Sequence, residues 1–267
     1  MKHKRRGQSL VEFALVALVV YMLLAALLTF GHMLFVAQGT QQVADLMAHE
    51  ISRIPLPADD TFEDTLDNGS IDDIFQKRYL VIDFPPGTTF EDLAANLPIV
   101  NQQLLPLMVV DEIDGNRVLR YPGAVIDQNG VRTVMIPLVT GRDDDGVETI
   151  EFVSVVEEIN SDEEPFQLSS TQRGIVALRI NYPYQSASMS SFRSRQFGDS
   201  QLGQPNIAND ASVIAGNVDG SLVASDIPTG PNSGDYGLGM QFAFGQSVRP
   251  YRRVISAQAI YRRETFQ

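Results

Sequence analysis

One long apolar stretch dominates the pattern of hydrophobic and polar positions near the N-terminus. From Phe13 to Phe30 only Thr29 interrupts the apolar residues, and the stretch continues through Gly31 and His32 to Val36. At about 1.5 Å per residue, a helix of this length crosses a hydrocarbon core of roughly 30 Å. The pattern therefore predicts a transmembrane helix over residues 8–36.

An amphipathic pattern follows the apolar stretch and predicts a helical stalk over residues 37–54. Its apolar members form a stripe on one helical face. The positions at three- and four-residue spacing are Val43, Leu46, Met47, Glu50, Ile51 and Ile54. Pro55 and Pro57 end the pattern. A single helix from Ser9 to Arg53 would be about 68 Å long, with its outer half packed against an extracytoplasmic domain formed by residues 55–267.

Alternating apolar residues and turn dipeptides predict β-structure in the rest of the chain. Hairpin turns are expected at Asp114-Gly115, Asn129-Gly130 and Asp145-Gly146. Residues 173–184 favour a further strand, and residues 254–261 a final one. Together they predict an antiparallel meander of four to six strands against the helix, with Pro137 at an edge or a bulge. The predicted fold class is α+β, with a long N-terminal transmembrane and stalk helix packed on an antiparallel sheet.

Two further segments differ from this strand pattern. Residues 88–97 predict a short helix, because Thr88 and Glu91 have the spacing of a capping box. Residues 185–239 are rich in Ser, Gly, Asn, Asp and Gln and have few large apolar side chains. They predict an irregular surface insertion, for which contact with a partner and a passive loop are both open interpretations.

The distribution of basic residues predicts the membrane topology. Lys2, His3, Lys4, Arg5 and Arg6 precede the apolar stretch, and no Lys or Arg follows until Arg53. The positive-inside rule therefore keeps residues 1–7 in the cytoplasm and sends the chain after about residue 37 across the membrane. A cleaved signal peptide is the alternative, but the apolar stretch is long for one and no small-x-small cleavage site closes it before Gln38 and Gly39.

Composition narrows the classes of function. The net charge of −13 would become −17 without the four Lys and Arg of residues 1–7, and this acidity argues against a nucleic-acid partner. The chain has no cysteine, and His3, His32 and His49 have no metal or catalytic partner at motif spacing. Phosphate-binding loops and nucleophile elbows do not occur in the sequence. We therefore expect no enzymatic activity, no cofactor and no small-molecule substrate.

An acidic turn is a weak candidate for a calcium site. Asp143, Asp144 and Asp145 lie together, but an EF-hand alignment puts Gly141 first and Phe152 twelfth, where carboxylates are required. The EF-hand interpretation therefore fails. A looser calcium site at these three residues and a plain acidic turn remain the alternatives.

The segment around Glu12 resembles the processing site of type IV prepilins. Its elements are the basic leader of residues 1–7 ending in Gly7, then Gln8, and, four positions later, Glu12 followed by Phe13. The start "GQSLVEFALV" is most similar to TadE-like pseudopilins, minor components of the tight-adherence (Flp, type IVb) pilus system. The resemblance covers residues 4 to about 36, and a weaker similarity occurs in "AIYRRE", residues 259–264.

This resemblance implies a maturation step and a set of partners. A prepilin peptidase would recognise the site with Arg5 and Arg6 and cut after Gly7, so the mature chain would begin at Gln8. Other pilins and the pilus assembly machinery would then contact Glu12 and Phe13. The expected location is the bacterial inner membrane, as a single-pass protein with a cytoplasmic N-terminus and a periplasmic or extracellular domain, and an assembled pilus.

Electrostatics provides a physical reason for the predicted cleavage. A charge at the centre of a membrane helix costs about 2.5–3.5 kcal/mol, and less near its end. The new amine of Gln8 in one subunit could pair with Glu12 of a staggered neighbour. Such a pair at about 4 Å is worth roughly 4 kcal/mol before desolvation. Alternatively, Glu12 is tolerated at the membrane boundary. The protein would then be a permanently anchored extracellular binding module or adhesin that is not processed.

Overall fold

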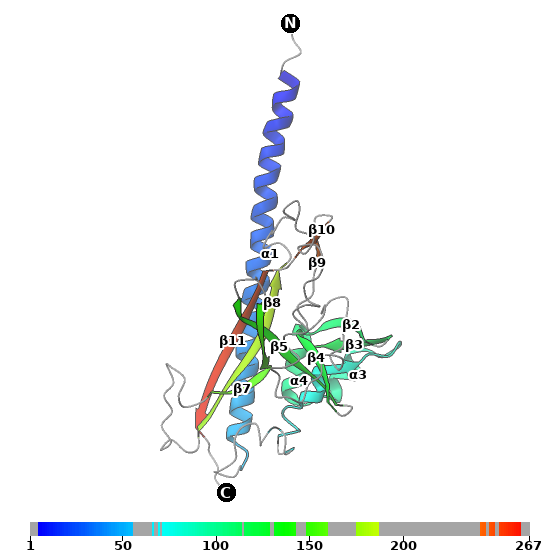
Figure 1. Ribbon diagram of the computed structural model, residues 1–267, viewed down its shortest axis with the longest axis vertical. Coiled ribbons are helices and arrows are strands. Elements are labelled where there is room, and N and C mark those ends of the chain that lie inside the picture. Colours follow the sequence, from blue (N-terminus) through cyan, green and yellow to red (C-terminus); the bar gives the residue numbers. More distant parts are fainter. Residues whose placement is uncertain are drawn as a thin grey trace.

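A computed structural model describes most of the helical and strand-forming parts of the chain. The described residues are 5–55, 66, 69, 71–113, 115–128, 131–142, 148–159, 175–186, 241–243, 246–248 and 251–262. A long helix, α1 (Arg5–Ser52), projects far beyond a domain that lies beside its C-terminal half (Figure 1). This arrangement confirms the predicted α+β class.

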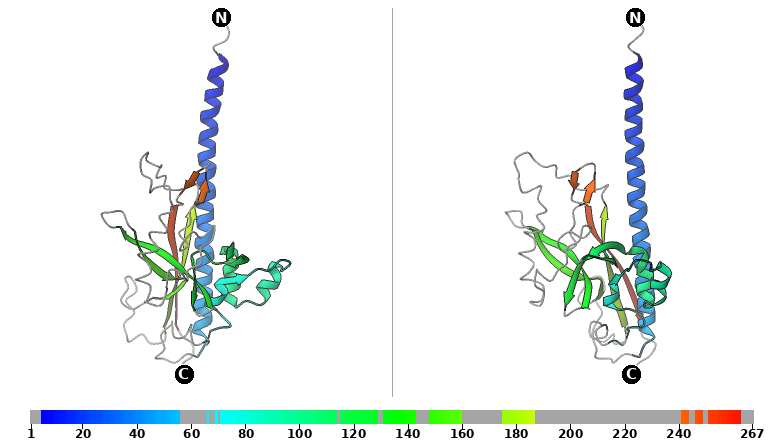
Figure 2. Two further views of the ribbon diagram at one scale, coloured as in Figure 1. Left: turned by 45° about the vertical axis from the view of Figure 1, so that its right-hand side comes forward. Right: turned by 90° about the vertical axis from the view of Figure 1, so that its right-hand side faces the viewer.

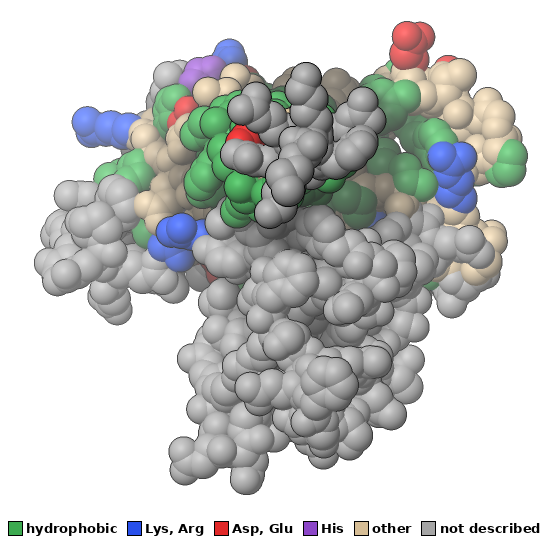
Figure 3. Space-filling view, turned by 90° about the horizontal axis from the view of Figure 1, so that it is seen from above, with side chains coloured by type: hydrophobic (Ala, Val, Ile, Leu, Met, Phe, Trp, Pro, Cys, Tyr) green, Lys and Arg blue, Asp and Glu red, His purple; other side chains and the backbone are tan. Residues whose placement is uncertain are grey.

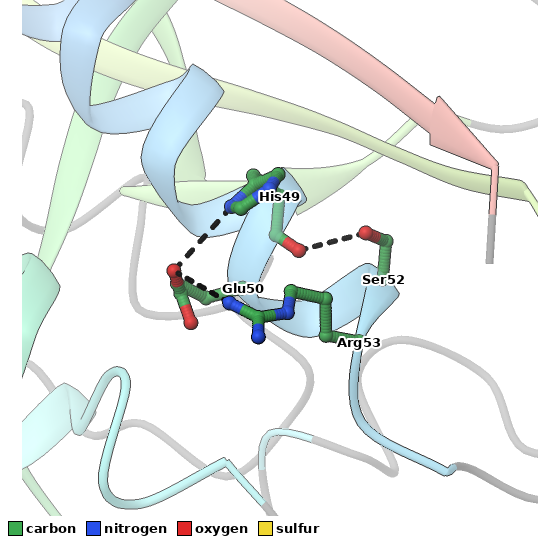
Figure 4. A network of polar contacts seen from close by, with 4 residues as sticks. All are labelled: His49, Glu50, Ser52 and Arg53. Atoms are coloured by element: carbon green, nitrogen blue, oxygen red, sulfur yellow. Dashed lines mark hydrogen bonds and ion pairs between the residues drawn. The ribbon is translucent and has the colours of Figure 1, made fainter. Parts of the chain in front are cut away.

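Helix α1 is continuous from the basic leader to the end of the predicted stalk. No proline occurs between Arg5 and Ser52, so nothing in the sequence interrupts the backbone hydrogen bonds of the helix. The last turn is closed by its own polar groups, because the Ser52 hydroxyl donates to the carbonyl oxygen of His49 at 2.7 Å (Figure 4). In the same network, Oε1 of Glu50 lies 3.4 Å from Nδ1 of His49 and 3.9 Å from Nη1 of Arg53. The helix therefore ends shortly before Pro55, as predicted.

One face of the C-terminal half of α1 is buried against the domain. Its buried residues follow three- and four-residue steps, which place them on a single stripe. They are Thr29, Val36, Thr40, Val43, Ala44, Met47, Ala48, Ile51 and Ser52. The predicted stripe is confirmed for Val43, Met47 and Ile51, and burial extends toward the N-terminus as far as Thr29.

Two long antiparallel strands receive this stripe. Strand β8 (Ile175–Ser186) pairs with β11 (Tyr251–Arg262) over their full length, and β7 (Val156–Glu158) pairs with the other edge of β8. Both long strands run alongside α1 in every view (Figure 2). Alternate residues of β8, from Val176 to Tyr184, belong to the same hydrophobic cluster as the helix stripe. The side chains of the buried Ala257 and Ala259 are small, so α1 can lie close to β11 in this cluster.

Three polar or aromatic contacts fix the helix along these strands. Near the start of the stripe, the Tyr184 hydroxyl donates to the carbonyl oxygen of Thr29 at 2.8 Å. In the middle, the Gln41 amide donates to the carbonyl oxygen of Gln258 at 3.0 Å. At the far end, the rings of His49 and Tyr261 meet edge to face at 5.7 Å. The strands therefore follow the helix axis over about 30 Å, from residue 29 to residue 49.

The remaining described elements form smaller units. The first sheet has the order β1 (Val81–Asp83), β3 (Asn116–Arg120), β2 (Val109–Ile113), and the second the order β4 (Ala124–Gln128), β5 (Val131–Arg142), β6 (Glu148–Ser154). Strands β9 (Gln241–Ala243) and β10 (Gln246–Val248) form a hairpin. The helical segments are η1 (Lys77–Leu80), α3 (Phe90–Ala95), α4 (Ile99–Leu104) and η2 (Leu105–Leu107). Of these, α4 packs against α1.

The expected single meander is wrong, because the strands divide among separate sheets. Between β3 and β4 the chain turns at Gly123, whose φ is 143°. The buried Arg120 side chain donates to the carbonyl oxygen of Gly123 at 2.9 Å, and the amide of Tyr121 donates to that of Leu80 at 2.8 Å. These bonds direct β4 away from the first sheet. After β6, the chain bends at Val155, and β7 joins β8 instead of continuing the second sheet.

The predicted hairpin positions agree with the strand registers. Ile113 pairs with Asn116 across Asp114-Gly115, and Gly115 has a φ of 77°. Gln128 pairs with Val131 across residues 129–130, and Arg142 pairs with Glu148 across residues 143–147; the turn residues themselves lie outside the described residues. Within the predicted insertion 185–239, only Gln185 and Ser186 are described, and both belong to β8.

Pro137 lies where β5 has a free side among the described strands. Its pairing with Phe152 of β6 continues, whereas β4 pairs with β5 only as far as Met135. A proline without an N–H is tolerated at such an edge. Although β5 is the central strand of its sheet, Pro137 lies beyond the last residue of β5 that pairs with β4, and a bulge lies nearby, between Val139 and Gly141.

The capping-box prediction for residues 88–97 is off by one residue. Thr89, and not Thr88, is the N-cap of α3, because its hydroxyl oxygen accepts from the Asp92 amide at 3.1 Å. Thr88 belongs to the preceding turn, where its amide donates to the carbonyl oxygen of Pro85 at 3.2 Å. Asp92 therefore takes the place that Glu91 was expected to fill.

A buried polar cluster around Asn181 joins the strands of the β11–β8–β7 sheet. The Asn181 side-chain amide donates to the Ser154 carbonyl at 3.1 Å and to the Glu157 carboxylate at 2.6 Å, and its oxygen accepts from the Ser256 hydroxyl at 2.7 Å. Tyr121 donates to the Asn181 carbonyl oxygen at 3.0 Å. Burial raises the pKa of Tyr121 above its ordinary value, so this hydroxyl stays protonated and able to donate.

We predict that Asn181→Asp destabilises the protein by about 3 kcal/mol, because it replaces a donor with an acceptor that faces the Ser154 carbonyl and the Glu157 carboxylate. Thermal unfolding of the full chain in detergent measures the effect. The double variant Asn181→Asp/Glu157→Gln should recover about 1–2 kcal/mol, because a glutamine at 157 can donate to the new carboxylate. Equal stability of the single and double variants would contradict the assignment of this contact.

We also predict that Gly123→Ala destabilises the protein more than Gly87→Ala. Both glycines have positive φ, 143° and 89°, so both substitutions strain the backbone. Only at Gly123 would a Cβ also meet Val134 Cγ1 at 2.6 Å and the Met135 carbonyl oxygen at 2.7 Å, whereas nothing lies within 4 Å at Gly87. We expect losses of about 3 and about 1 kcal/mol, respectively, in the same unfolding measurement.

Candidate functional site

The N-terminal half of α1 is an exposed apolar rod. From Ser9 to Leu28 every side chain is exposed apart from the half-buried Ala25. Seen from the N-terminal end of the molecule, hydrophobic side chains gather around the helix (Figure 3). Phe13, for example, is 73% exposed and Leu28 is 75% exposed. A contiguous surface of this kind requires lipid or other apolar helices around it.

Helix α1 is long and apolar enough to cross a membrane, by its length and composition. It is the one helix with this property among the described residues. The domain covers little of this apolar part, which distinguishes α1 from the core helix of a compact protein.

Glu12 places a carboxylate on the exposed part of this rod. Its side chain is exposed, and so are those of its neighbours Leu10, Val11, Phe13 and Leu15. A carboxylate surrounded by apolar surface is costly in lipid unless a cation or hydrogen-bond donors accompany it. Because the position faces outward, a group on another molecule can reach it. The predicted assembly residues Glu12 and Phe13 therefore lie side by side on accessible helix surface.

The predicted processing site lies in the backbone of the first turns of α1. Arg5, Arg6, Gly7 and Gln8 are helical, and their side chains lie outside the described part of the chain. Gln8 and Glu12 are four residues apart, which puts them on the same helical face, one turn from each other. Glycine lowers helix stability by about 1 kcal/mol relative to alanine, so Gly7 makes the first turns of the helix easier to unwind. Unwinding there would expose the peptide bond between Gly7 and Gln8.

The other chemical candidates gain no support from the described residues. Within these, no group of three or more His, Asp or Glu side chains could hold a metal ion. Asp143, Asp144 and Asp145, the weak calcium candidates, lie outside the described residues. His32 stacks on Tyr184 with a ring-centroid distance of 5.5 Å, and His49 meets Tyr261. Both histidines therefore contribute to the contact between the helix and the sheet.

The residues that dock the domain nearest to the apolar rod were not predicted from the sequence. These are Thr29, His32 and Tyr184, which meet through one hydrogen bond and one ring contact. A signal for them existed, because Thr29 is the one polar residue between Phe13 and Phe30. Its partner on β8 could not be found from helix periodicity, since more than a hundred residues separate the two in the chain.

Comparison with known proteins identifies the part of the chain that carries this arrangement. Neither the curated proteins nor the solved structures gave a match. A family model described as TadE-like protein matches residues 7–49, from the glycine of the predicted cut to the last turns of α1. The N-terminal helix of this chain is therefore similar to that of TadE-like proteins.

Proposed function

We propose that this protein is a pilin-like structural component of a tight-adherence type IVb pilus or secretion system. In this proposal it is inserted in the bacterial inner membrane through α1, with its N-terminus in the cytoplasm and its domain outside. A prepilin peptidase cuts it after Gly7, and it then assembles with other pilins through its N-terminal helix. It acts as a substrate and a building block, and we assign it no reaction of its own.

The observation that carries this proposal is the exposed Glu12 on an apolar helix, within the segment that matches the TadE-like family. An ordinary anchor needs only an apolar surface, and a carboxylate near its start makes insertion less favourable. A helix that assembles with others gains from the same carboxylate, because it selects one register between neighbours. The position of Glu12 is therefore better explained by assembly than by anchoring alone.

Cleavage would supply the matching charge. Removal of residues 1–7 creates an α-amino cation at Gln8, one helical turn from Glu12. In a staggered array, the amine of one subunit reaches the carboxylate of the next. A pair at about 4 Å contributes roughly 4 kcal/mol at an effective dielectric of 20, from which desolvation must be subtracted. Before cleavage the amine does not exist, so processing would control when assembly begins.

We predict that Glu12→Gln leaves cleavage intact and strongly reduces assembly, because glutamine keeps the shape of the side chain but lacks the charge. The measurement is the amount of protein in sheared surface filaments, or in crosslinked complexes with partner pilins, in a host with a tight-adherence system. Asp45→Asn is the matched control, since Asp45 lies on the same helix and only accepts a bond from Gln41 among the contacts described. Normal assembly of Glu12→Gln would refute the proposed pairing.

We predict that the mature chain begins at Gln8 in a host with a prepilin peptidase, as read by N-terminal sequencing or intact mass. Gly7→Val should remain uncut, because a β-branched side chain hinders both unwinding and backbone access at the cleavage site. Gly31→Ala is the control, since nothing lies within 4 Å of a Cβ at that glycine. An intact leader in the parent protein would instead favour a permanently anchored binding module.

A further inference from the structure

The domain docks onto α1 close to the point where a helix that enters the hydrocarbon core between Ser9 and Phe13 would leave it. The basic residues Arg5 and Arg6 prevent the core from beginning much before Ser9, and a later start would put Glu12 at its boundary. Residues 9–28 span about 30 Å, and so do residues 13–32. The first contact of the domain, from Tyr184 to the carbonyl oxygen of Thr29, lies within about one turn of either end point.

The opposite face of α1 stays apolar past this point. Phe30, Leu34 and Phe35 are 55%, 63% and 52% exposed, although Thr29 and Val36 on the other face are buried by the domain. The exposed apolar surface ends at Gln38, which is exposed and polar. The headgroup regions add about 5–7 Å on each side of the hydrocarbon core, which corresponds to about four more residues of helix. Phe30, Leu34 and Phe35 thus continue the surface of the span into this layer.

The charges at this end of the domain suit lipid headgroups. Arg253 is exposed and pairs with Tyr184 across β11 and β8, and Arg252 precedes it in β11. The chain as a whole is acidic, with a net charge of −13, which would repel an anionic bilayer surface. The exposed Arg253, at the strand end nearest to the span, opposes this repulsion locally. Arginine, tyrosine and histidine side chains all suit the polar boundary of a membrane.

We propose that residues 29–35 of α1 and the adjoining end of the β8–β11 pair form a bilayer-contact surface. Phe30, Leu34 and Phe35 lie in the outer boundary of the membrane, and the start of β11, with the exposed Arg253, contacts lipid phosphates. The domain therefore rests in the headgroup layer at a fixed height, because α1 is continuous and no linker separates the span from the docked sheet. This inference rests on membrane insertion of α1, which is part of the proposed function, but it requires neither cleavage nor assembly.

Site-directed labelling of the full, uncut chain in vesicles of phosphatidylethanolamine and phosphatidylglycerol tests the helix part. The chain has no cysteine, so each introduced cysteine carries the only label. Nitroxides at Leu24→Cys, Phe35→Cys and Gln42→Cys are compared by their accessibility to oxygen and to a water-soluble nickel chelate. We expect Leu24 to be deep in lipid, Phe35 to be shielded from the chelate at the membrane boundary, and Gln42 to be in water.

The outcomes separate this inference from the proposed function. A Phe35 label as accessible to the chelate as the Gln42 label, with Leu24 still in lipid, would overturn the contact surface and leave insertion intact. A Leu24 label in water would refute insertion, and both proposals with it. Shielding at Phe35 together with exposure at Gln42 supports the contact surface.

A second measurement tests the domain part with a matched pair on one strand. A fluorophore at Arg253→Cys should be quenched by lipids that carry a spin label on the headgroup. A fluorophore at Arg262→Cys, about 30 Å farther along β11, should not be quenched. Adding Arg252→Glu to the first variant should reduce its quenching in anionic vesicles, whereas adding Arg262→Glu should not. Equal quenching at positions 253 and 262, or no effect of Arg252→Glu, would contradict the contact with lipid phosphates.

Discussion

The packing of one stripe of α1 against β8 and β11 is the constraint on which the rest of the structure depends. These strands come from residues 175–186 and 251–262, far from the helix in sequence, and their alternate apolar residues complete the hydrophobic cluster of the stripe. Bringing such distant segments together costs loop-closure entropy, which the burial of this shared surface offsets. The small residues Ala257 and Ala259 let the helix lie close to β11. The other sheets are attached to this unit.

The same helix has two different surroundings along its length. Up to Leu28 its apolar side chains are exposed all round, which suits lipid or neighbouring helices, and from Thr29 onward one face is covered by the domain. The change is marked by a polar contact rather than by a break in the helix, since Thr29 accepts a hydrogen bond from Tyr184. Glu12 and Thr29 thus lie near the two ends of the part of α1 whose described side chains are mostly exposed.

Much of the helix and several hairpins could be predicted because they depend on local sequence. The apolar run, the stripe through Met47 and Ile51, and the stop before Pro55 set the extent of α1, and the dipeptide Asp114-Gly115 marks a turn that the register of β2 and β3 confirms. The distribution of strands among sheets could not be predicted in this way. It depends on tertiary contacts such as those of Arg120 with Gly123 and of Asn181 with Glu157.

The candidate site, too, could be predicted from the sequence only in part. Glu12 and Phe13 lie on the exposed surface of α1. Their role in assembly, the cleavage after Gly7 and the pairing of Glu12 depend on other molecules and remain predictions. The N-cap of α3 shows the limit of a local rule. Thr88 takes part in the preceding turn, so the N-cap is Thr89, one residue later than predicted.

The unbroken course of α1 has a mechanical consequence. A pull on the N-terminal half travels through the helix backbone into a contact that lies parallel to the direction of tension, since β8 and β11 follow the helix axis. Detaching the sheet would then require many side-chain contacts and the Tyr184, Gln258 and Tyr261 attachments to slide at once, rather than to peel one after another. The contact between α1 and the sheet would thus resist a pull along the helix axis more strongly than a pull across it.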